Sequence, residues 1–277
     1  MVDKHAFLIM AHAEPVMLRE LIDEIDDERA DIFVHIDRKA PFDGSELTTA
    51  KSKLTVLPKR IDGRWGDYSL VEIELELLKA ATDNDQYARY HLISGMDMLT
   101  ADIDSIIAEC SNAPRTEFIA IARNVSADEL RYRSQHRFLF PGHFRSKNPL
   151  LRAMRKAWAM CQSAAGYRRC PLPIVKGSQW WSITDSFARY CLDHSSWIEE
   201  WFRGTYCPDE MVFQTLCMNS EFAADICRAD DEFDGNRRYI KWENGQLMPL
   251  TDADLTEARR HGRWFARKRP ARTTTQS

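Results

Sequence analysis

Short apolar runs alternate with stretches of helical periodicity through the first half of the chain. The runs occupy residues 5–12, 32–36, 54–57, 89–94 and 117–121. Between them, apolar side chains recur at helical spacing at residues 14–25, 70–81 and 103–109. Runs that are apolar throughout are typical of strands buried on both faces, and the intervening helices supply the crossovers of a parallel sheet. The alternation predicts an α/β fold in which a mainly parallel, mixed central sheet is flanked by helices.

The second half of the chain continues this pattern less regularly. Residues 124–170 are rich in Arg and Lys and form a predicted excursion from the sheet, with one helix at 149–164. Further elements are predicted at residues 176–183 (strand), 186–193 (helix), 238–242 (strand) and from Thr251 into 263–268 (helix). Because no linker or internal repeat interrupts it, residues 1–270 are predicted to form one domain. The basic excursion is interpreted as a lid on the acceptor side, and residues 271–277 as a disordered tail.

Composition and charge exclude several classes of protein. The chain is 44% hydrophobic and 29% charged with a net charge of −4, which argues against bulk nucleic-acid binding. No apolar run approaches the ~20 residues of a membrane-spanning helix, and the N-terminus lacks the layout of a signal peptide. The 7 cysteines are an odd number without a Cys-x-x-Cys pair, which fits a reducing compartment. We therefore expect a cytoplasmic protein that at most associates peripherally with a membrane.

Polar residues stand where three of the predicted strands end. His12 follows the first run, Asp37 the second, and Asp97 the run at 89–94. In parallel α/β sheets the ligand crevice lies outside the carboxyl ends of the strands, so these residues hint at a nucleotide-binding cleft. The alternative is that they are ordinary turn residues, which often end strands in such folds.

A second candidate site is the sequence Pro208-Asp209-Glu210. Proline suits the first turn of a helix, and the two acids complement the positive end of the helix dipole. A helix anchored by the apolar residues that follow would hold a carboxylate rigidly at the mouth of a cleft. The simpler interpretation is that these residues only begin a helix. The neighbouring Cys207 is interpreted as a packing residue.

The sequence lacks the usual devices for binding a diphosphate. It contains no glycine-rich phosphate loop, and no Asp-x-Asp follows a predicted strand to hold a divalent cation. The three Asp-x-Asp sequences, at residues 83–85, 102–104 and 252–254, fall at predicted helix ends. A bound diphosphate would have to be neutralised by Arg and Lys, and the segment at 263–268 carries Arg263, Arg267 and Lys268.

Eight blocks in this order resemble the core-2/I-branching family of β-1,6-N-acetylglucosaminyltransferases, in its shorter bacterial form. The blocks are the first strand ending in Ala-His (5–12), His-Ile-Asp-Arg-Lys (35–39), Trp-Gly-Asp-Tyr-Ser-Leu-Val (65–71), His-Leu-Ile-Ser-Gly-Met-Asp (91–97), Lys-Gly-Ser-Gln-Trp (176–180), Pro-Asp-Glu with Phe-Gln-Thr (208–215), Arg-Tyr-Ile-Lys-Trp (238–242) and Phe-Ala-Arg-Lys (265–268). The resemblance covers residues 5–269. It implies a GT-A-type fold, a UDP-sugar donor, a saccharide acceptor, inversion at the anomeric carbon and no metal cofactor.

The resemblance also implies roles for individual residues. Glu210 matches the general base, Lys268 contacts the diphosphate, Asp37 approaches the nucleoside, and Trp242 lies under the acceptor sugar. The other predicted site residues are Arg267, Arg263, His12 and Tyr68 on the donor side and Asp97, Trp180 and Arg133 on the acceptor side. Animal members use a second basic residue upstream of the Lys, but residues 245–249 contain no Arg here. Arg267, Arg263 or Arg238 is expected to substitute for it.

The predicted activity is therefore transfer of a sugar from a UDP-sugar to a saccharide hydroxyl, with N-acetylglucosamine as the first candidate for the sugar. Three alternatives remain open at this point. The first is a xylosyltransferase-like member of the same family. The second is a non-catalytic nucleotide- or sugar-binding protein on the same fold. The third is a metal-dependent phosphoryl or nucleotidyl transferase, which would need clustered carboxylates at strand ends.

Overall fold

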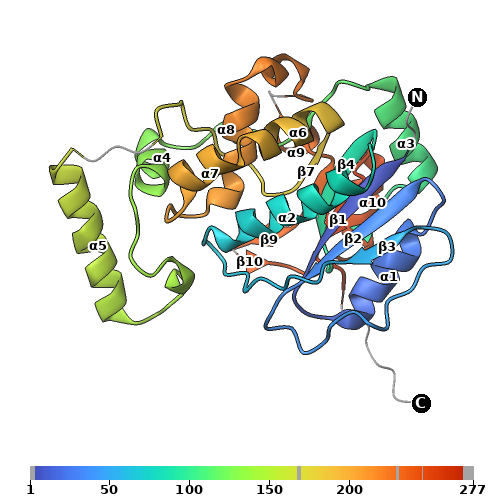
Figure 1. The fold of residues 1–277 in the computed structure, drawn as a ribbon, viewed down its shortest axis with the longest axis horizontal. Helices are drawn as coiled ribbons and strands as arrows, with labels where there is room; N and C mark the ends of the chain where they lie inside the picture. The colour runs from blue at the N-terminus through green and yellow to red at the C-terminus, as the bar shows by residue number, and fades with distance from the viewer. Residues whose placement is uncertain (1–3, 167–169, 229–230, 245, 271–277) are drawn as a thin grey trace.

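A six-stranded sheet forms the centre of the molecule (Figure 1). The structure is a computed structural model that describes residues 4–166, 170–228, 231–244 and 246–270. The strands of this sheet, in spatial order, are β3 (Leu54–Val56), β2 (Ala30–Ile36), β1 (His5–Ala11), β4 (Arg89–Ser94), β7 (Trp181–Ile183) and β6 (Phe118–Ile119). The first four pair in parallel, whereas β7 is antiparallel to both of its neighbours. The prediction of a mainly parallel, mixed sheet flanked by helices is confirmed.

Both faces of the central strands are buried, which explains why most of their residues are apolar. Every residue of β1, β2 and β4 is buried. Successive side chains of a strand point to opposite faces, so Leu8 belongs to one core cluster and Ile9 to the other. The first cluster is completed by α2 (Ser69–Asn84), α6 (Asp185–Asp193), α7 (Ser195–Phe202) and α8 (Val212–Met218), and the second by α1 (Pro15–Ile25) and α3 (Ile103–Asn112).

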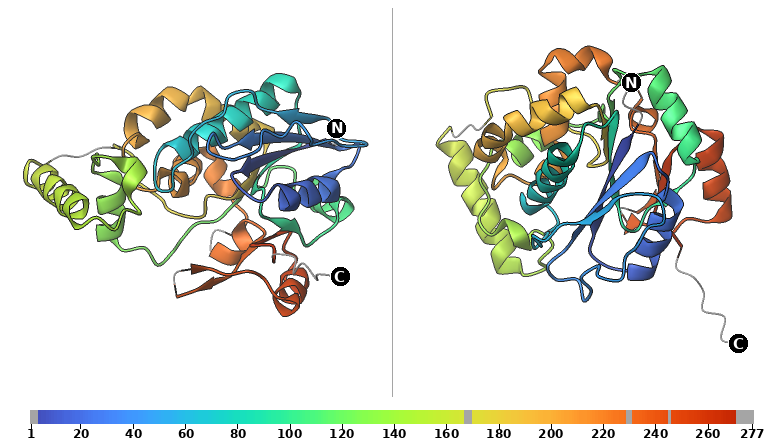
Figure 2. Two further views of the ribbon diagram at one scale, coloured as in Figure 1. Left: turned by 90° about the horizontal axis from the view of Figure 1, so that it is seen from below. Right: turned by 45° about the vertical axis from the view of Figure 1, so that its right-hand side comes forward.

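A small second sheet packs against the second core cluster, and its strands are β5 (Met98–Leu99), β11 (Phe265–Arg267) and β8 (Arg238–Ile240). Strand β11 is central and runs parallel to β8 and antiparallel to β5. Beyond β8 lie the hairpin of β9 (Trp242–Glu243) and β10 (Gln246–Leu247) and the helix α10 (Asp252–Arg260). Figure 2 shows these C-terminal elements together on one side of the main sheet.

The predicted extension of the last helix into residues 263–268 is wrong. Thr251 begins α10 as expected, with a capping box in which Asp254 participates. The helix ends before Gly262, whose φ of +62° is the left-handed conformation that terminates helices. The next residues, including Trp264 and Phe265, are fully buried in the second core cluster. Strand pairing and this burial override the local helical preference of the segment.

The basic excursion leaves the sheet and forms one end of the molecule (Figure 1, Figure 2). It contains α4 (Ala127–Ser134), a 3₁₀ turn at Pro141–His143 and α5 (Pro149–Ala164). The bounds of α5 agree with the prediction, but α4 was not predicted because its sequence is polar on all sides. Arg168, Arg169 and the tail at 271–277 lie outside the described residues.

The remaining elements are short, and they are the 3₁₀ turns η2 (Pro208–Glu210) and η3 (Glu221–Asp225) and the helix α9 (Glu232–Gly235). All seven cysteines are free thiols. Within the described ranges, no helix is both long enough and apolar enough to cross a membrane.

Candidate active site

Strands β1, β2 and β4 end at the edge of the sheet where the sequence predicts the ligand site. Met10 is in register with His35 on one side and Ser94 on the other, so the three strands finish at the same edge. The backbone N–H of Asp37 donates to the carbonyl of Ala11 at 2.8 Å, directly before His12. The turn after β4 brings Asp97 to the same edge. Three of the predicted site residues are thereby brought together at the carboxyl ends of adjacent parallel strands.

The Asp37 carboxylate is buried and fixed by a loop. One oxygen accepts a hydrogen bond from the Lys39 N–H at 2.7 Å, and the other accepts from the Gly63 N–H at 2.9 Å. A β-carbon at position 63 would lie 2.9 Å from the second oxygen, so only glycine allows this approach. The Nζ of Lys39 forms an ion pair with the carboxylate at 3.1 Å and also contacts Asp62. Asp37 therefore presents a rigid carboxylate beside an ammonium group.

Arg267 lies in a nearly buried position between Asp97 and Trp180. Its Nε is 3.2 Å from Asp97 Oδ1, and its guanidinium carbon lies 4.2 Å from the centre of the Trp180 ring. The other oxygen of Asp97 accepts a hydrogen bond from the Ser94 N–H at 2.9 Å. Burial raises the pKa of Asp97 and lowers that of Arg267, because a low-dielectric site disfavours both charges. A guanidinium in such a site acts strongly on a nearby anion.

Asp97 and Trp180 lie in positions that differ from the predicted ones. The sequence analysis assigned Asp97 and Trp180 to the acceptor side, but the structure places both against the donor-side candidate Arg267. Both side chains are at most 8% exposed, which leaves little surface for a sugar to contact. They orient the guanidinium from two sides.

His12 and Lys268 complete the group at this edge. Desolvation lowers the pKa of His12, and the positive charges of Arg267 and Lys268 lower it further, while Asp37 acts in the opposite direction. These interactions place the imidazole within the field of all three charged groups. Lys268 is partly exposed and follows Arg267 at the end of β11. We call the residues His12, Asp37, Asp97, Arg267 and Lys268 the strand-end cluster.

Glu210 lies in the separate 3₁₀ turn η2, not in the first turn of the following helix. The backbone at Met211, with φ −132° and ψ −31°, separates this turn from α8. The carboxylate is 31% exposed and accepts a hydrogen bond from Arg133 Nη1 at 2.6 Å. Lys176 Nζ lies 3.8 Å from the same oxygen. Glu210 is thus a partly accessible carboxylate oriented by two cations.

Arg133 connects Glu210 to a second acid on the basic excursion. Its Nε is 3.0 Å from Glu129 Oε1, and its guanidinium stacks 5.3 Å from the centre of the Tyr206 ring. The sequence analysis assigned Arg133 to acceptor binding, but its nearest charged partner is the candidate base. No signal in the sequence indicated Glu129 as a partner, because helix α4 itself was not predicted.

The segment from Lys176 to Trp180 links Glu210 to the strand-end cluster. The Gly177 N–H donates to the Glu210 carbonyl at 2.8 Å, and Trp180 lies under Arg267. A β-carbon at Gly177 would lie 1.7 Å from the carbonyl oxygen of Ala120, so the backbone approaches closely only with glycine. Three residues of backbone, at most ~11 Å, therefore separate the contact with Glu210 from the contact with Arg267.

A pair of buried acids lies behind Glu210. Asp209 is 6% exposed, and burial together with the charge of Glu210 raises its pKa to about 7. Glu74 of α2 is fully buried, and burial and then Asp209 raise its pKa well above the usual range. Gln179 Nε2 donates to one Glu74 oxygen at 2.8 Å. The other Glu74 oxygen and one of Asp209 have no hydrogen-bond partner among the described residues. Neutral, protonated carboxyls suit such a site.

The raised pKa of Asp209 predicts a pH-dependent stability. The folded state holds the Asp209 proton more tightly than the unfolded state, in which the ordinary pKa is near 3.8. The free energy of unfolding should therefore fall as the pH rises towards 7, by about 3 kcal/mol from this group between pH 5 and pH 8. Urea unfolding of the wild type and Asp209→Asn at both pH values measures this. The variant should lack that part of the fall, whereas the same fall in both proteins would refute the assignment.

Arg263 and Tyr68 do not join the strand-end cluster. Arg263 precedes β11, whereas Lys268 follows it, so the two residues lie at opposite ends of the strand. Arg263 is 7% exposed and forms an ion pair with Asp234. Tyr68 is buried at the start of α2, with the guanidinium of Arg203 over its ring at 4.6 Å. Their predicted donor contacts have no support in these positions.

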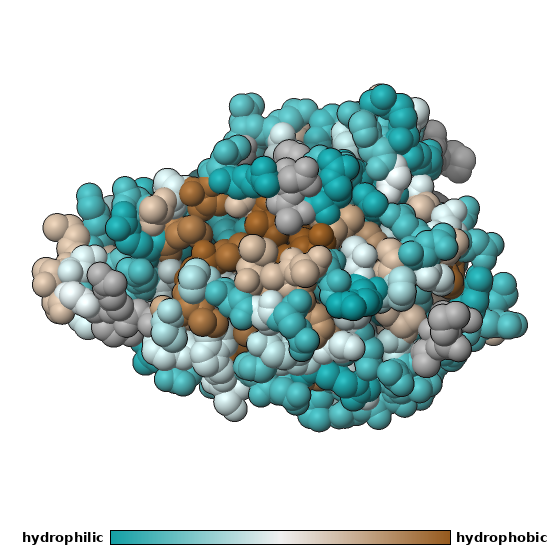
Figure 3. Space-filling model, turned by 90° about the horizontal axis from the view of Figure 1, so that it is seen from above, coloured by the Kyte–Doolittle hydropathy of each residue, from teal (hydrophilic) through white to brown (hydrophobic). Residues whose placement is uncertain are grey.

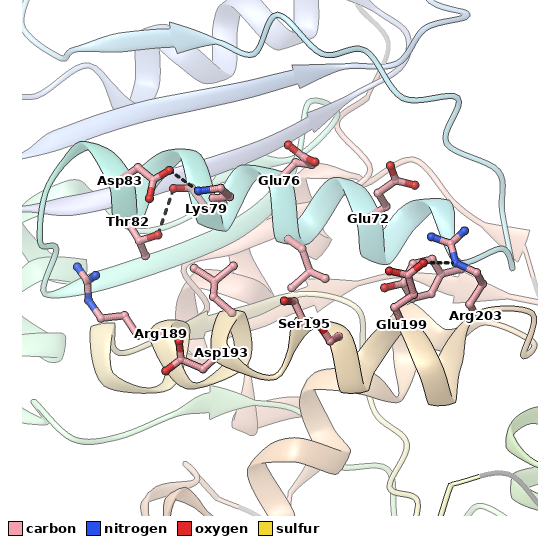
Figure 4. A pocket seen from close by; sticks show the side chains of 14 residues that line it. Glu72, Glu76, Lys79, Thr82, Asp83, Arg189, Asp193, Ser195, Glu199 and Arg203 are labelled. Carbon is pink, nitrogen blue, oxygen red and sulfur yellow. Dashed lines mark hydrogen bonds and ion pairs between the residues drawn. The ribbon is translucent and has the colours of Figure 1, made fainter.

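The groove that Tyr68 lines is a different feature from the strand-end cluster. It has a volume of about 660 Å³ and lies between α2 and the helices α6 and α7. Figure 4 shows charged side chains of both signs along it, with Arg203 beside Glu199 at one end and Lys79 beside Asp83 at the other. No other predicted site residue lines this groove, so we do not place the chemistry there.

Trp242 remains accessible at the carboxyl ends of the small sheet. Ile240, two residues earlier, is in register with Arg267, so the β9–β10 hairpin projects from the same end of the sheet as Lys268. The indole is 62% exposed. This large exposed aromatic face, at the same end of the small sheet as Lys268 of the strand-end cluster, is available to pack on a sugar ring.

The Asp-x-Asp sequences are engaged in structural roles. Asp102 caps α3 through the Ser105 N–H, Asp254 takes part in the α10 capping box and pairs with Lys241, and Asp83 pairs with Lys79. Across the part of the chain that the structure describes, no group of three or more His, Cys, Asp or Glu side chains is arranged to hold a metal ion. At the strand-end cluster, the groups placed to meet an anion are Arg267, Lys268 and Lys39.

The mainly parallel, mixed α/β sheet flanked by helices is that of a GT-A-like fold, which a class of glycosyltransferases adopts. The family model described as Core-2/I-Branching enzyme matches residues 5–269, and the chain belongs to this family of glycosyltransferases. It therefore acts on a donor and an acceptor substrate. No curated protein matches the chain.

Proposed function

We propose that this protein is an inverting, metal-independent glycosyltransferase with Glu210 as its general base. It would transfer a sugar, N-acetylglucosamine in the first place, from a UDP-sugar to a saccharide hydroxyl. The observation that carries the proposal is the Glu210 carboxylate, partly accessible and oriented by Arg133 at 2.6 Å. The segment from Lys176 to Trp180 connects Glu210 to the strand-end cluster, because Gly177 bonds the Glu210 carbonyl and Trp180 packs against Arg267.

The reaction needs a base on the acceptor. As the acceptor oxygen attacks the anomeric carbon, Glu210 takes the hydroxyl proton and the bond from that carbon to the phosphate oxygen breaks. Attack from the side opposite the leaving group inverts the anomeric configuration. Arg133 and Lys176 hold the carboxylate in place through ion pairs to one of its oxygens.

The reaction also needs positive charge on the leaving group. UDP departs with its electron pair as the transition state becomes oxocarbenium-like, so negative charge accumulates on the diphosphate. Arg267 and Lys268 supply positive charge at the carboxyl ends of β11 and its neighbours, where other enzymes use a divalent cation. The arrangement of Asp97 and Trp180 around Arg267 supports this role, because a guanidinium fixed in advance requires little reorganisation.

The substrates are assigned to two sides of the site. Asp37 and His12 lie on the donor side, next to the nucleoside position in this proposal. Trp242 lies on the acceptor side, with its exposed indole under the sugar ring. Tyr68 and Arg263 are not included, because neither contacts the strand-end cluster.

The test is a panel of UDP-sugars assayed for UDP release in the presence of EDTA. We expect hydrolysis of one donor, with UDP-N-acetylglucosamine the first choice, and faster release when an acceptor saccharide is added. Preference for UDP-xylose would assign the protein to the xylosyltransferase-like alternative. Donor binding without any UDP release, measured by calorimetry on the same samples, would contradict the proposal in favour of a binding protein.

A further inference from the structure

The helix α5 exposes an apolar face along its whole length. Leu150, Met154 and Met160 are 67%, 43% and 63% exposed. At 100° per residue, one side of the helix carries the exposed residues Leu150, Ala153, Met154, Ala157, Met160, Cys161 and Ala164. Exposed apolar surface of this extent marks an interaction site in a folded protein.

The opposite side of α5 attaches the helix to the rest of the molecule. Trp158 Nε1 donates to the Arg137 carbonyl at 2.7 Å, and Gln162 Oε1 accepts from the Arg137 N–H at 2.9 Å. Arg155 is buried, with its guanidinium 5.1 Å from the centre of the Phe144 ring. Because these contacts fix one side of α5 against the rest of the molecule, the apolar side faces outward. Figure 1 shows α5 at the end of the molecule, away from the main sheet.

The stretch of sequence that contains α5 carries charge of one sign. From residue 130 to residue 184 the chain contains no Asp or Glu, although its overall net charge is −4. The basic residues of this span are Arg131, Arg133, Arg137, Arg145, Lys147, Arg152, Arg155, Lys156, Arg168, Arg169 and Lys176. On α5 itself, Arg152 and Lys156 are exposed beside the apolar face. Figure 3 shows further apolar surface between the end that carries α5 and the middle of the molecule.

We propose that α5 docks on an anionic membrane surface, with its apolar face in the boundary between headgroups and acyl chains. Arg152, Lys156 and Lys147 would contact lipid phosphates. An apolar face on a helix whose charged residues are all basic is the pattern of helices that lie in the plane of an interface. A second copy of the chain is disfavoured as the occupant, because a symmetric contact would bring like charges together.

The inference concerns where the protein binds and stands independently of the transfer reaction. It has one structural consequence for the site. Helix α4, which precedes α5 in the same excursion, carries Arg133 to Glu210. A membrane contact through α5 would therefore hold the Glu210 side of the molecule near the lipid surface.

Flotation of the protein with phosphatidylcholine vesicles, with and without phosphatidylglycerol, tests the proposal. We expect the wild type to float only with the anionic vesicles and to be released by salt. The double variant Leu150→Glu/Met160→Glu should bind about tenfold more weakly or worse, since it places charge in the apolar face. Arg152→Gln/Lys156→Gln should bind about thirtyfold more weakly, from the loss of two basic residues.

The matched control is Val16→Glu. Val16 is an apolar residue of α1 that is 64% exposed, close to the value for Leu150, and its change should leave flotation unaltered. Unchanged thermal unfolding of all variants shows that they remain folded. The proposal is overturned if the wild type does not bind anionic vesicles or binds both vesicle types equally. It is overturned as well if the α5 variants bind anionic vesicles as well as the wild type does. It is also overturned if sedimentation shows a dimer that Leu150→Glu/Met160→Glu dissociates, which would assign the face to a second copy.

Discussion

Replacing Glu210 by Gln is expected to lower the transfer rate by a factor of about 10²–10⁴ while leaving UDP affinity almost unchanged. Glutamine has nearly the same shape as glutamate but does not accept the proton of the acceptor hydroxyl. In the proposed site the strand-end cluster binds the diphosphate, so the change at Glu210 should have little effect on the affinity for UDP. Initial rates of UDP release with acceptor, together with calorimetric titration of UDP, measure both quantities.

Glu129→Gln is the matched control for this change. Glu129 contacts the same guanidinium as Glu210, with Arg133 Nε 3.0 Å from its Oε1. Its change also removes one negative charge from Arg133, but it does not touch the candidate base. We expect only a small loss of rate. Transfer by Glu210→Gln at the wild-type rate, or an equal loss in the two variants, would show that Glu210 is not the base.

Replacing Lys268 by Met is expected to lower kcat by about 10²–10³-fold and to weaken UDP binding. The side chain supplies positive charge where the diphosphate gathers negative charge, and Met removes that charge with little change in length. Lys268 is the better target than Arg267, because removing Arg267 would leave the buried Asp97 without its ion-pair partner and destabilise the fold. Steady-state rates and UDP titrations measure the effect.

Arg263→Met is the discriminating control for Lys268. Both residues belong to the basic C-terminal segment that the sequence analysis assigned to the diphosphate. Arg263 precedes β11 and pairs with Asp234, at the other end of the strand from Lys268. Its loss should therefore lower stability and leave UDP binding by the folded protein unchanged. If Arg263→Met lost UDP binding while Lys268→Met retained it, the assignment of the two residues would be reversed.

The sheet could be predicted from the sequence because its strands are buried on both faces. Burial on both faces favours runs that are mostly apolar, and β1 and most of β2 carry that signature without a partner having to be known. Helix α5 was also predictable, because Pro149 marks its start and its apolar periodicity is strong. These are local properties of the chain.

The errors arose where distant residues decide the structure. Strand β11 has a sequence compatible with a helix, and only its pairing with β5 and β8 makes it a strand. Arg133 lies 77 residues from Glu210, and no periodicity reports such a contact. For the same reason the contacts of Asp97 and Trp180 with Arg267 were not predicted. Tyr68 belonged to a motif, yet its ring packs under Arg203.

The central claim is that protein cations, and not a metal ion, neutralise the departing UDP. The most direct measurement is the initial rate of UDP release from the preferred UDP-sugar, with acceptor, in EDTA and then with added Mg²⁺ or Mn²⁺. The account predicts full activity in EDTA and no stimulation by either ion, with activity lost in Lys268→Met under both conditions. Activity that disappears in EDTA and returns with the metal would contradict it.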